Sequence, residues 1–229
     1  MTITIPTTVM LAMVMACGNG TSQGVDVDAP AAPSDGPAAL SAGERATLAF
    51  VREEEKLARD VYDALDGNGQ PFVNVQASEQ RHMDQILVLL ERYGLPDPAA
   101  TTAIGAFVDP ALQGLYTQLV GQGQAGASAA YTVGCTIEDL DLRDLDRAIA
   151  ESTHADLDDT YALLAMGSRN HLRAFYGRLT AAGGSYAPQY IDQATFDAIV
   201  SSPHEKPAGG HRCGGGACPH QGHPNALRP

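Results

Sequence analysis

Basic residues are scarce in this chain and tryptophan is missing. Among 229 residues, 14 are Lys or Arg and 27 are Asp or Glu, so the formal net charge is −13. Proteins that dock on nucleic acid or anionic lipid by charge need basic patches. The sequence therefore argues against nucleic acid as a partner and against electrostatic docking to a membrane. Hydrophobic residues still make up 44% of the chain, which is compatible with a globular core.

Cysteines are also few, and apolar runs are short. Cys17, Cys135, Cys213 and Cys218 do not form the evenly spaced framework of small disulfide-rich domains. We expect Cys135 to be a structural or loop thiol. The sequence lacks a rubredoxin-like pair of Cys-x-x-Cys segments, so any electron supply would come from another molecule. The apolar run at residues 9–16 is shorter than the ~20 residues that a membrane-spanning helix requires.

The N-terminal segment has the features of an export signal. Residues 9–16 fit the apolar region of a secretory signal, and Val14-Met15-Ala16-Cys17 resembles the lipobox of bacterial lipoproteins. We predict a signal and lipobox segment at 1–17 with Cys17 as the lipidation site, followed by a disordered linker at 18–42. This predicts a lipid-anchored protein of the cell envelope or periplasm. No Lys or Arg precedes the apolar run, so a frayed tail on a cytoplasmic protein is the alternative.

From residue 43 onward, apolar residues recur with a helical period. The segment 95–134 is predicted to hold one short helix and a loop of small residues, and its length fits one long crossover. We therefore predict an all-α fold in which 43–190 form an antiparallel four-helix bundle flanked by disordered tails. Residues 191–229 are predicted to be a tail, largely disordered from about residue 203. The four main helices are predicted at about 43–65, 74–93, 136–152 and 156–182.

The second predicted helix carries the strongest indication of chemistry. Glu79 and His82 lie in the middle of its apolar stripe. A buried carboxylate is costly unless it is paired or bound to a metal. A Glu and a His three residues apart share a helix face and can ligate one metal, as in the Glu-x-x-His motif of di-iron bundles. We predict a carboxylate–histidine metal site centred on this pair, with a hydrogen-bonded Glu–His pair as the alternative.

The first predicted helix contains three consecutive glutamates. Its periodicity favours Glu54 as the inward carboxylate and places Glu55 at the margin of the buried side. Because charge runs usually face water, we expect Glu53 and Lys56 to be solvated. The choice between Glu54 and Glu55 stays open at this point.

The third and fourth predicted helices also direct ligand-type side chains inward. Glu138 projects into the middle of the third apolar stripe and Asp141 toward its margin, while Thr136 is the predicted N-cap. On the fourth helix Ser168 lies in the middle and His171 toward one side. The acidic residues of the third helix that we expect to be solvated are Asp139, Asp144 and Asp146.

Four stretches of the sequence resemble a known family. FVREEEKLARDVY, SEQRHMDQILVLLERYGL, TIEDLDLRDLDRAI and GSRNHLRAFYGRL are similar to a bacterial and archaeal domain-of-unknown-function family of the ferritin-like superfamily. Ferritins and rubrerythrins commonly carry Glu-x-x-Ala-x-x-x-Tyr on the first helix, where the Glu is a ligand. That register corresponds to Glu55, Ala58 and Tyr62, so the resemblance selects Glu55 and keeps Glu54 in reserve.

The fourth helix departs from the rubrerythrin-like pattern. A second Glu-x-x-His is usual there, whereas this chain has Ser168-x-x-His171. One carboxylate of the usual set is therefore missing, and Asp141 is the candidate to replace it. Without that replacement, a second metal position would be weak or absent.

Three functional hypotheses follow from these residues and the resemblance. The first is a ferritin-like metal-binding protein of the cell envelope with one or two iron or manganese ions, acting as a ferroxidase or peroxidase-like oxidoreductase. The second is a non-catalytic lipoprotein that binds or handles transition-metal ions. The third is a structural bundle whose inward polar groups only hydrogen-bond one another. The sequence does not fix the oligomeric state, and a homodimer is one assembly we consider. The expected ligands of the metal centre are Glu55, Glu79, His82, Glu138 and His171, with Glu54 and Asp141 in reserve.

The C-terminal tail offers a second candidate metal site. Thiolate and imidazole ligands suit zinc or copper, and short His/Cys-rich tracts are candidate metal binders. In an oxidising compartment Cys213 and Cys218 could instead form a disulfide. The candidate tail ligands are His211, Cys213, Cys218, His220 and His223.

Overall fold

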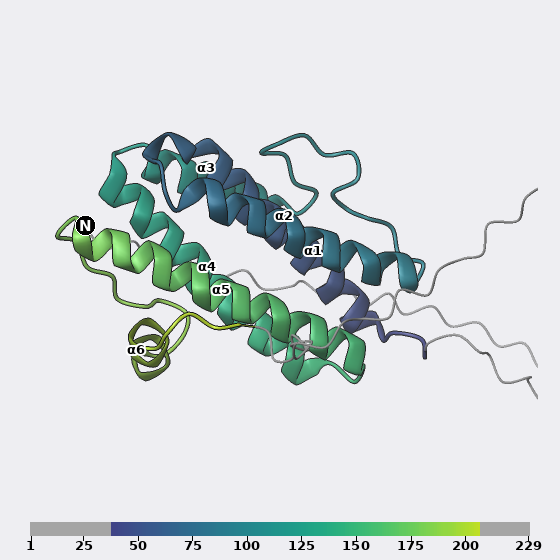
Figure 1. The fold of residues 1–229 in the computed structure, drawn as a ribbon. Helices are drawn as coiled ribbons and strands as arrows, with labels where there is room; N and C mark the ends of the chain where they lie inside the picture. Colours follow the sequence, from purple (N-terminus) through teal and green to yellow (C-terminus); the bar gives the residue numbers. More distant parts are fainter. Residues whose placement is uncertain (1–37, 207–229) are drawn as a thin grey trace, which may run out of the picture.

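A computed structural model describes residues 38–206, so the predictions for Cys17, for the segments 1–17 and 18–37, and for the tail ligands lie outside the described residues. The described part is all helical and contains no strand, which confirms the all-α bundle (Figure 1). None of its helices is long and apolar enough to cross a bilayer. The elements are α1 (Ala42–Ala64), η1 (Asp66–Asn68), α2 (Phe72–Arg92), α3 (Pro110–Gly123), α4 (Ala127–Glu151), α5 (Ala155–Ala181) and α6 (Gln193–Ser201).

The helices form two antiparallel hairpins, α1–α2 and α4–α5, joined by a long crossover that carries α3 (Figure 1). At one end of the bundle the start of α1 meets the α4–α5 connection, where Glu44 accepts the backbone N–H of Thr153 (2.9 Å). At the same end Tyr93, just after α2, donates its hydroxyl to Asp156 near the start of α5 (2.9 Å). The long crossover therefore returns the chain along the bundle before α4 begins, as the segment length predicted.

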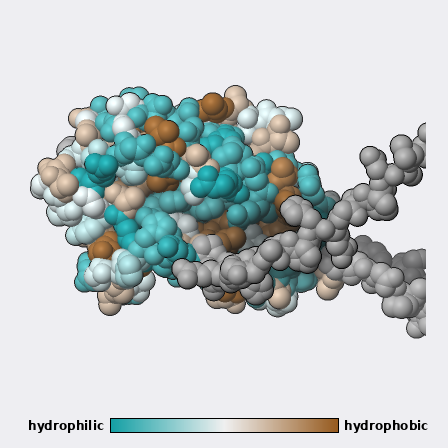
Figure 2. All heavy atoms as spheres, in the orientation of Figure 1, coloured by the Kyte–Doolittle hydropathy of each residue, from teal (hydrophilic) through white to brown (hydrophobic). Residues whose placement is uncertain are grey.

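The core consists of the apolar stripes of the main helices, and an aromatic cluster closes the end opposite to Glu44. The ring of Phe175 on α5 lies 5.0 Å from that of Tyr62 on α1 and 5.1 Å from that of Phe72 on α2. Gly134 on α4 makes room for this ring, because a Cβ there would come within 2.4 Å of Phe175. Hydrophilic residues dominate the face seen in Figure 2, with scattered apolar ones. The buried stripes thus point inward and fix the relative rotation of the helices around the centre of the bundle.

Two boundary predictions were wrong on α4. The helix begins at Ala127, so the small residues that we expected in a loop form its first turns. Thr136 is not an N-cap: it lies inside the helix and donates its hydroxyl to the carbonyl of Thr132 (2.9 Å). Cys135 is buried within α4, which agrees with the structural alternative for this thiol. Small residues are typical of loops, but alanine is also the best helix former, so this composition is compatible with the start of a helix.

The folded part of the chain also extends beyond residue 190, where we expected the bundle to end. Helix α6 packs on α5 and buries Phe196 and Ile199. Its N-cap is Asp192, whose carboxylate accepts the backbone N–H of Thr195 (2.9 Å). The short helix had no long apolar stripe from which it could be predicted.

The outer face of α1 is covered, which contradicts the predicted solvation of Glu53 and Lys56. Only 4% of Glu53 and 1% of Lys56 is exposed. Glu53 accepts the backbone N–H groups of Val108 (2.6 Å) and Asp109 (3.0 Å), and Lys56 donates to the carbonyl of Ala103 (2.9 Å). The charged run therefore anchors the crossover, supplying partners to backbone groups that a buried loop would otherwise leave unsatisfied.

Asp139 on α4 was also predicted to be solvated and is fully buried. Its carboxylate accepts the hydroxyl of Tyr186 (2.8 Å) and the backbone N–H groups of Gln189 (2.6 Å), Tyr190 (3.2 Å) and Ile191 (2.9 Å). Of the other two acids expected in water, Asp146 is exposed and Asp144 is partly buried beside Arg143. Asp139 thus fastens the segment between α5 and α6 to the bundle.

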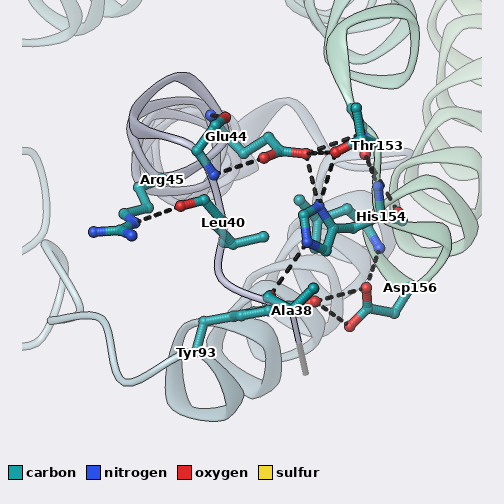
Figure 3. Close-up of polar contacts among 11 residues, drawn as sticks. Ala38, Leu40, Glu44, Arg45, Tyr93, Thr153, His154 and Asp156 are labelled. Carbon is teal, nitrogen blue, oxygen red and sulfur yellow. Dashed lines mark hydrogen bonds and ion pairs between the residues drawn. The ribbon is translucent and has the colours of Figure 1, made fainter. Parts of the chain in front are cut away.

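Glu44 organises the end of the bundle where the two hairpins meet (Figure 3). With Ser41 it forms a capping box at the start of α1. Its other oxygen accepts from Thr153 and lies 2.8 Å from Nδ1 of His154. Burial opposes ionisation, but these donors hold the pKa of Glu44 below its usual value, and the carboxylate raises the pKa of His154. One side chain therefore links the first helix to the second hairpin.

This contact predicts a pH-dependent part of the stability. The stabilisation that His154 contributes is fully present below about 6.5, the pKa of the residue in the unfolded chain. It is lost as the pH rises through the higher pKa that His154 has in the folded protein. The stabilisation that Glu44 contributes is present above about 4.5, the pKa of the residue in the unfolded chain. It is lost as the pH falls through the lower pKa that Glu44 has in the folded protein. Urea unfolding of wild type and His154→Ala should therefore differ more at about pH 5.5 than at about pH 9. A difference that grows with pH would contradict this assignment.

Candidate metal centre

Glu79 on α2 lies at the middle of the bundle with only 2% of its surface exposed. Its two carboxylate oxygens face two different histidines. Oε2 lies 2.8 Å from Nδ1 of His82, one turn along the same helix, and Oε1 lies 2.8 Å from Nδ1 of His171 on α5. The imidazole rings are stacked with their centroids 5.5 Å apart. A single carboxylate thus stands between two imidazoles from opposite hairpins.

Each histidine has a further carboxylate beside it. Glu55 on α1 places Oε2 3.1 Å from Nδ1 of His82, and Glu138 on α4 places Oε2 3.5 Å from Nδ1 of His171. Two groups of ligand-type atoms result, Glu55–Glu79–His82 and Glu79–Glu138–His171, and within each group all the atoms lie within 4.8 Å of one another. Five of the predicted ligands, one or two from each main helix, are therefore brought together.

The two reserve residues lie outside these groups. Glu54 and Asp141 are buried but belong to neither ligand cluster. Asp141 accepts a hydrogen bond from the hydroxyl of Ser168, at the position where the rubrerythrin-like pattern has a glutamate. The structure thus brings Glu55, which the resemblance selects, into a ligand cluster and leaves Glu54, which the helical projection favours, outside both clusters. Both glutamates are buried, because α1 packs against more than one neighbouring helix.

Several polar atoms of the centre have no hydrogen-bond partner among the described residues. These atoms are Glu55 Oε1, Glu79 Oε1 and His171 Nδ1. Glu79 Oε1 and His171 Nδ1 are close, but they are not oriented as donor and acceptor. Buried polar groups are rarely left without partners in folded proteins. Converging lone pairs of this kind fit a cation, and carboxylates with imidazoles suit iron or manganese.

The pKa values of these side chains in the protein without a cation also favour a cation site. Burial disfavours a charged imidazole, yet Glu79 and Glu138 raise the pKa of His171 to about 10, and Glu55 and Glu79 raise that of His82. Burial raises the pKa of Glu55 to about 7 although His82 opposes it. Burial also opposes ionisation of Glu79, but both imidazoles hold its pKa below the usual value. The carboxylates therefore favour positive charge at the centre. Protons supply this charge when no metal ion is bound.

Two neighbours that were not predicted as site residues shape the centre. Tyr62, fully buried on α1, donates its hydroxyl to Glu138 Oε1 (2.5 Å), which leaves Oε2 directed toward His171. Gly167 on α5 borders His82, because a Cβ at this position would lie 2.5 Å from Nε2. The tyrosine was recognised in the resemblance only as part of a motif. A glycine inside a helix was the available sign that a side chain comes close to α5.

Gly167→Ala is expected to weaken metal binding at the centre by at least ~10-fold, the lower range for disturbing an outer partner of a metal ligand. The added methyl group forces the imidazole of His82 away from the carboxylates. Alanine is the better helix former, so propensity does not destabilise the variant. Gly177→Ala is the matched control, because nothing lies within 4 Å of a Cβ at that position of α5. Metal titration of both variants checks the prediction, and equal affinities would contradict it.

Comparison with known proteins agrees with the resemblance at the level of the family. Residues 44–203 match the family described as an uncharacterized protein domain, DUF2202. The chain is 44% identical over 169 residues to an uncharacterized protein of Methanocaldococcus jannaschii, covering 73% of this chain and 91% of the relative. A crystal structure of a hypothetical protein from Methanococcus jannaschii is similar with a TM-score of 0.72 and 43% identity, covering 75% of this chain and 99% of that one. This chain therefore belongs to the DUF2202 family.

Proposed function

We propose that the protein is a ferritin-like metal-binding bundle whose centre holds one or two iron or manganese ions and supports a ferroxidase or peroxidase-like oxidoreductase reaction. The observation that carries this proposal is the position of Glu79. Its two oxygens face His82 and His171, and each of these histidines has a second carboxylate beside it. A bridging carboxylate between two such half-sites is the arrangement of di-iron and di-manganese bundles.

The unsatisfied atoms favour this proposal over a purely structural role. If the inward residues served only to hydrogen-bond one another, their donors and acceptors should be paired, because an unpaired buried group costs free energy. Glu55, Glu79 and His171 each keep a buried atom without a partner among the described residues. Metal ligation accounts for all three.

The roles of the side chains follow from their places. Glu55, Glu79 and His82 would hold one ion, and Glu79, Glu138 and His171 a second. Bound iron or manganese would supply redox chemistry with dioxygen or peroxide. Tyr62 orients Glu138 through its hydrogen bond, and the buried stripes of the four helices keep bulk water from the centre. The protein thus contributes position, charge and exclusion of water.

A specific observation supports the second candidate, a non-catalytic protein that binds or handles transition metals. Ser168 stands where a fourth glutamate is usual, and it engages Asp141. The two half-sites therefore have three carboxylates between them, where the usual pattern has four. This difference weakens the case for a symmetric redox centre. Lipid anchoring at Cys17, an envelope location and zinc or copper binding by the tail remain predictions.

Metal analysis of the full-length protein separates these hypotheses. We expect iron or manganese to remain bound when the five His and Cys ligands of the tail are replaced by Ser, and to be lost in Glu79→Ala. Peroxide-dependent absorbance changes would support the oxidoreductase, and their absence with metal bound would favour metal handling. Metal lost together with the tail ligands would overturn the bundle site. A wild type without metal that is more stable than Glu79→Ala would support a structural bundle, because the variant leaves the buried partners of Glu79 unpaired.

A further inference from the structure

Two buried acids beside the centre have no part in it. Glu54 on α1 is 3% exposed, and neither of its carboxylate oxygens accepts a hydrogen bond from an N–H or hydroxyl group of the described residues. Asp141 on α4 is also buried, with one oxygen bonded to Ser168 and the other without a partner. Burying carboxyl groups in this way is costly unless something compensates them. A bound ligand would compensate the cost of keeping both carboxyl groups in the core.

These acids lie between the surface and the centre. The carboxyl group of Asp144 lies within hydrogen-bonding reach of that of Glu54, and Asp141, one turn before Asp144 on α4, is a further charged neighbour of Glu54. Asp144 is partly exposed and is paired with Arg143 (2.6 Å), whose guanidinium lies over the ring of Tyr190 at the surface. At the inner end, Glu54 adjoins Glu55 in the chain. The carboxyl groups therefore form a series from the partly exposed Asp144 through Glu54 toward the centre.

Asp141 continues this series on α4. It is one helical turn from Glu138, and Glu55 and Glu138 are among the charged groups that act on its carboxyl. Among the described cations, Arg143 donates to both carboxylate oxygens of Asp144 (2.9 and 2.6 Å). Oxygen ligands of this kind bind hard divalent cations. The described residues form tight ligand groups only at the centre itself, so an ion among these acids would be held more loosely.

We propose that Glu54, Asp141 and Asp144 form an entry position through which a hard divalent cation such as Fe(II) or Mn(II) passes from the surface to the centre. The inference rests on the proposed metal function. Loose binding suits passage, because a site on a pathway must accept an ion and release it again. The carboxylate oxygens of Glu54, which accept from no donor of the described residues, are then the ligands that a passing ion uses between Asp144 and Glu55.

Stopped-flow loading of metal-free, full-length protein with Co(II) alone tests the entry position. We expect Glu54→Gln to slow the growth of the Co(II) absorbance of the centre by at least ~10-fold while the final amplitude stays that of wild type. Asp144→Asn should slow it too and, because this residue is partly exposed, serves as the second variant should Glu54→Gln fail to fold. Asp146→Asn, an exposed acid on the same helix, is the matched control and should load at the wild-type rate.

The outcomes separate this inference from the proposed function. Loading of Glu54→Gln and Asp144→Asn at the wild-type rate would overturn the entry position while leaving the centre intact. A reduced final amplitude in Glu54→Gln would also overturn it, because Glu54 would then be a ligand of the centre. A wild-type protein that gives no Co(II) signal would refute the metal function itself, and with it the entry position.

Discussion

Replacing Glu79 with Gln is expected to lower metal affinity at both half-sites together, by more than the ~10–100-fold typical of outer-sphere changes. Each histidine keeps its second carboxylate, but the group that the half-sites share loses its charge. Ligand binding also stabilises a folded protein, by about 2.7 kcal/mol at a concentration of 100 times Kd. Thermal unfolding with and without Mn(II) should therefore show a metal-dependent shift in wild type that disappears in the variant.

Glu91→Gln provides the control for this experiment. Glu91 lies exposed on the same helix, so the substitution removes one negative charge from α2 without touching the centre. Its metal-dependent shift should equal that of wild type. If Glu79→Gln kept one half-site at full affinity, Glu79 would belong to a single metal position and would not bridge two.

Replacing Asp139 with Ala is expected to destabilise the protein by about 3 kcal/mol or more, because several donors lose one shared acceptor and an unsatisfied buried group costs about 1–3 kcal/mol. The variant leaves the hydroxyl of Tyr186 and three backbone N–H groups without their shared acceptor. The segment that leads to α6 would then lose its attachment to α4. Urea unfolding monitored by circular dichroism measures the loss.

Asp146→Ala is the matched control, since it removes an exposed acid from the same helix and surface substitutions usually change stability by less than about 0.5 kcal/mol. Equal unfolding midpoints for the two variants would show that the Asp139 contacts contribute nothing to stability. A loss in Asp139→Ala confined to α6, with the bundle midpoint unchanged, would limit its role to the last helix.

The sequence was most informative where one helix buries one face. On α2 a single apolar stripe contains Glu79 and His82, and both are buried in the structure. The number and order of the main helices followed from the same periodicity, and the long crossover followed from the length of the segment 95–134. These features are local, because the spacing of apolar residues within one helix shows which of its faces is buried.

The sequence was less informative where a helix is covered on more than one side. On α1 the crossover packs against a charged run, so the prediction that Glu53 and Lys56 are solvated was wrong. Asp139 was misplaced for the same reason, since its partners come from a segment about 50 residues away. Such burial depends on contacts between distant segments, which helical periodicity does not contain.

The burial of Cys135 has a practical consequence for work on the rest of the chain. Burial raises the pKa of its thiol, so the reactive thiolate form is suppressed, and the side chain is closed to solvent. An alkylating reagent added to the native protein should therefore spare this position. Labelling before and after reduction would then report on the other cysteines. Without any substitution, it would reveal whether Cys213 and Cys218 are free thiols or form a disulfide.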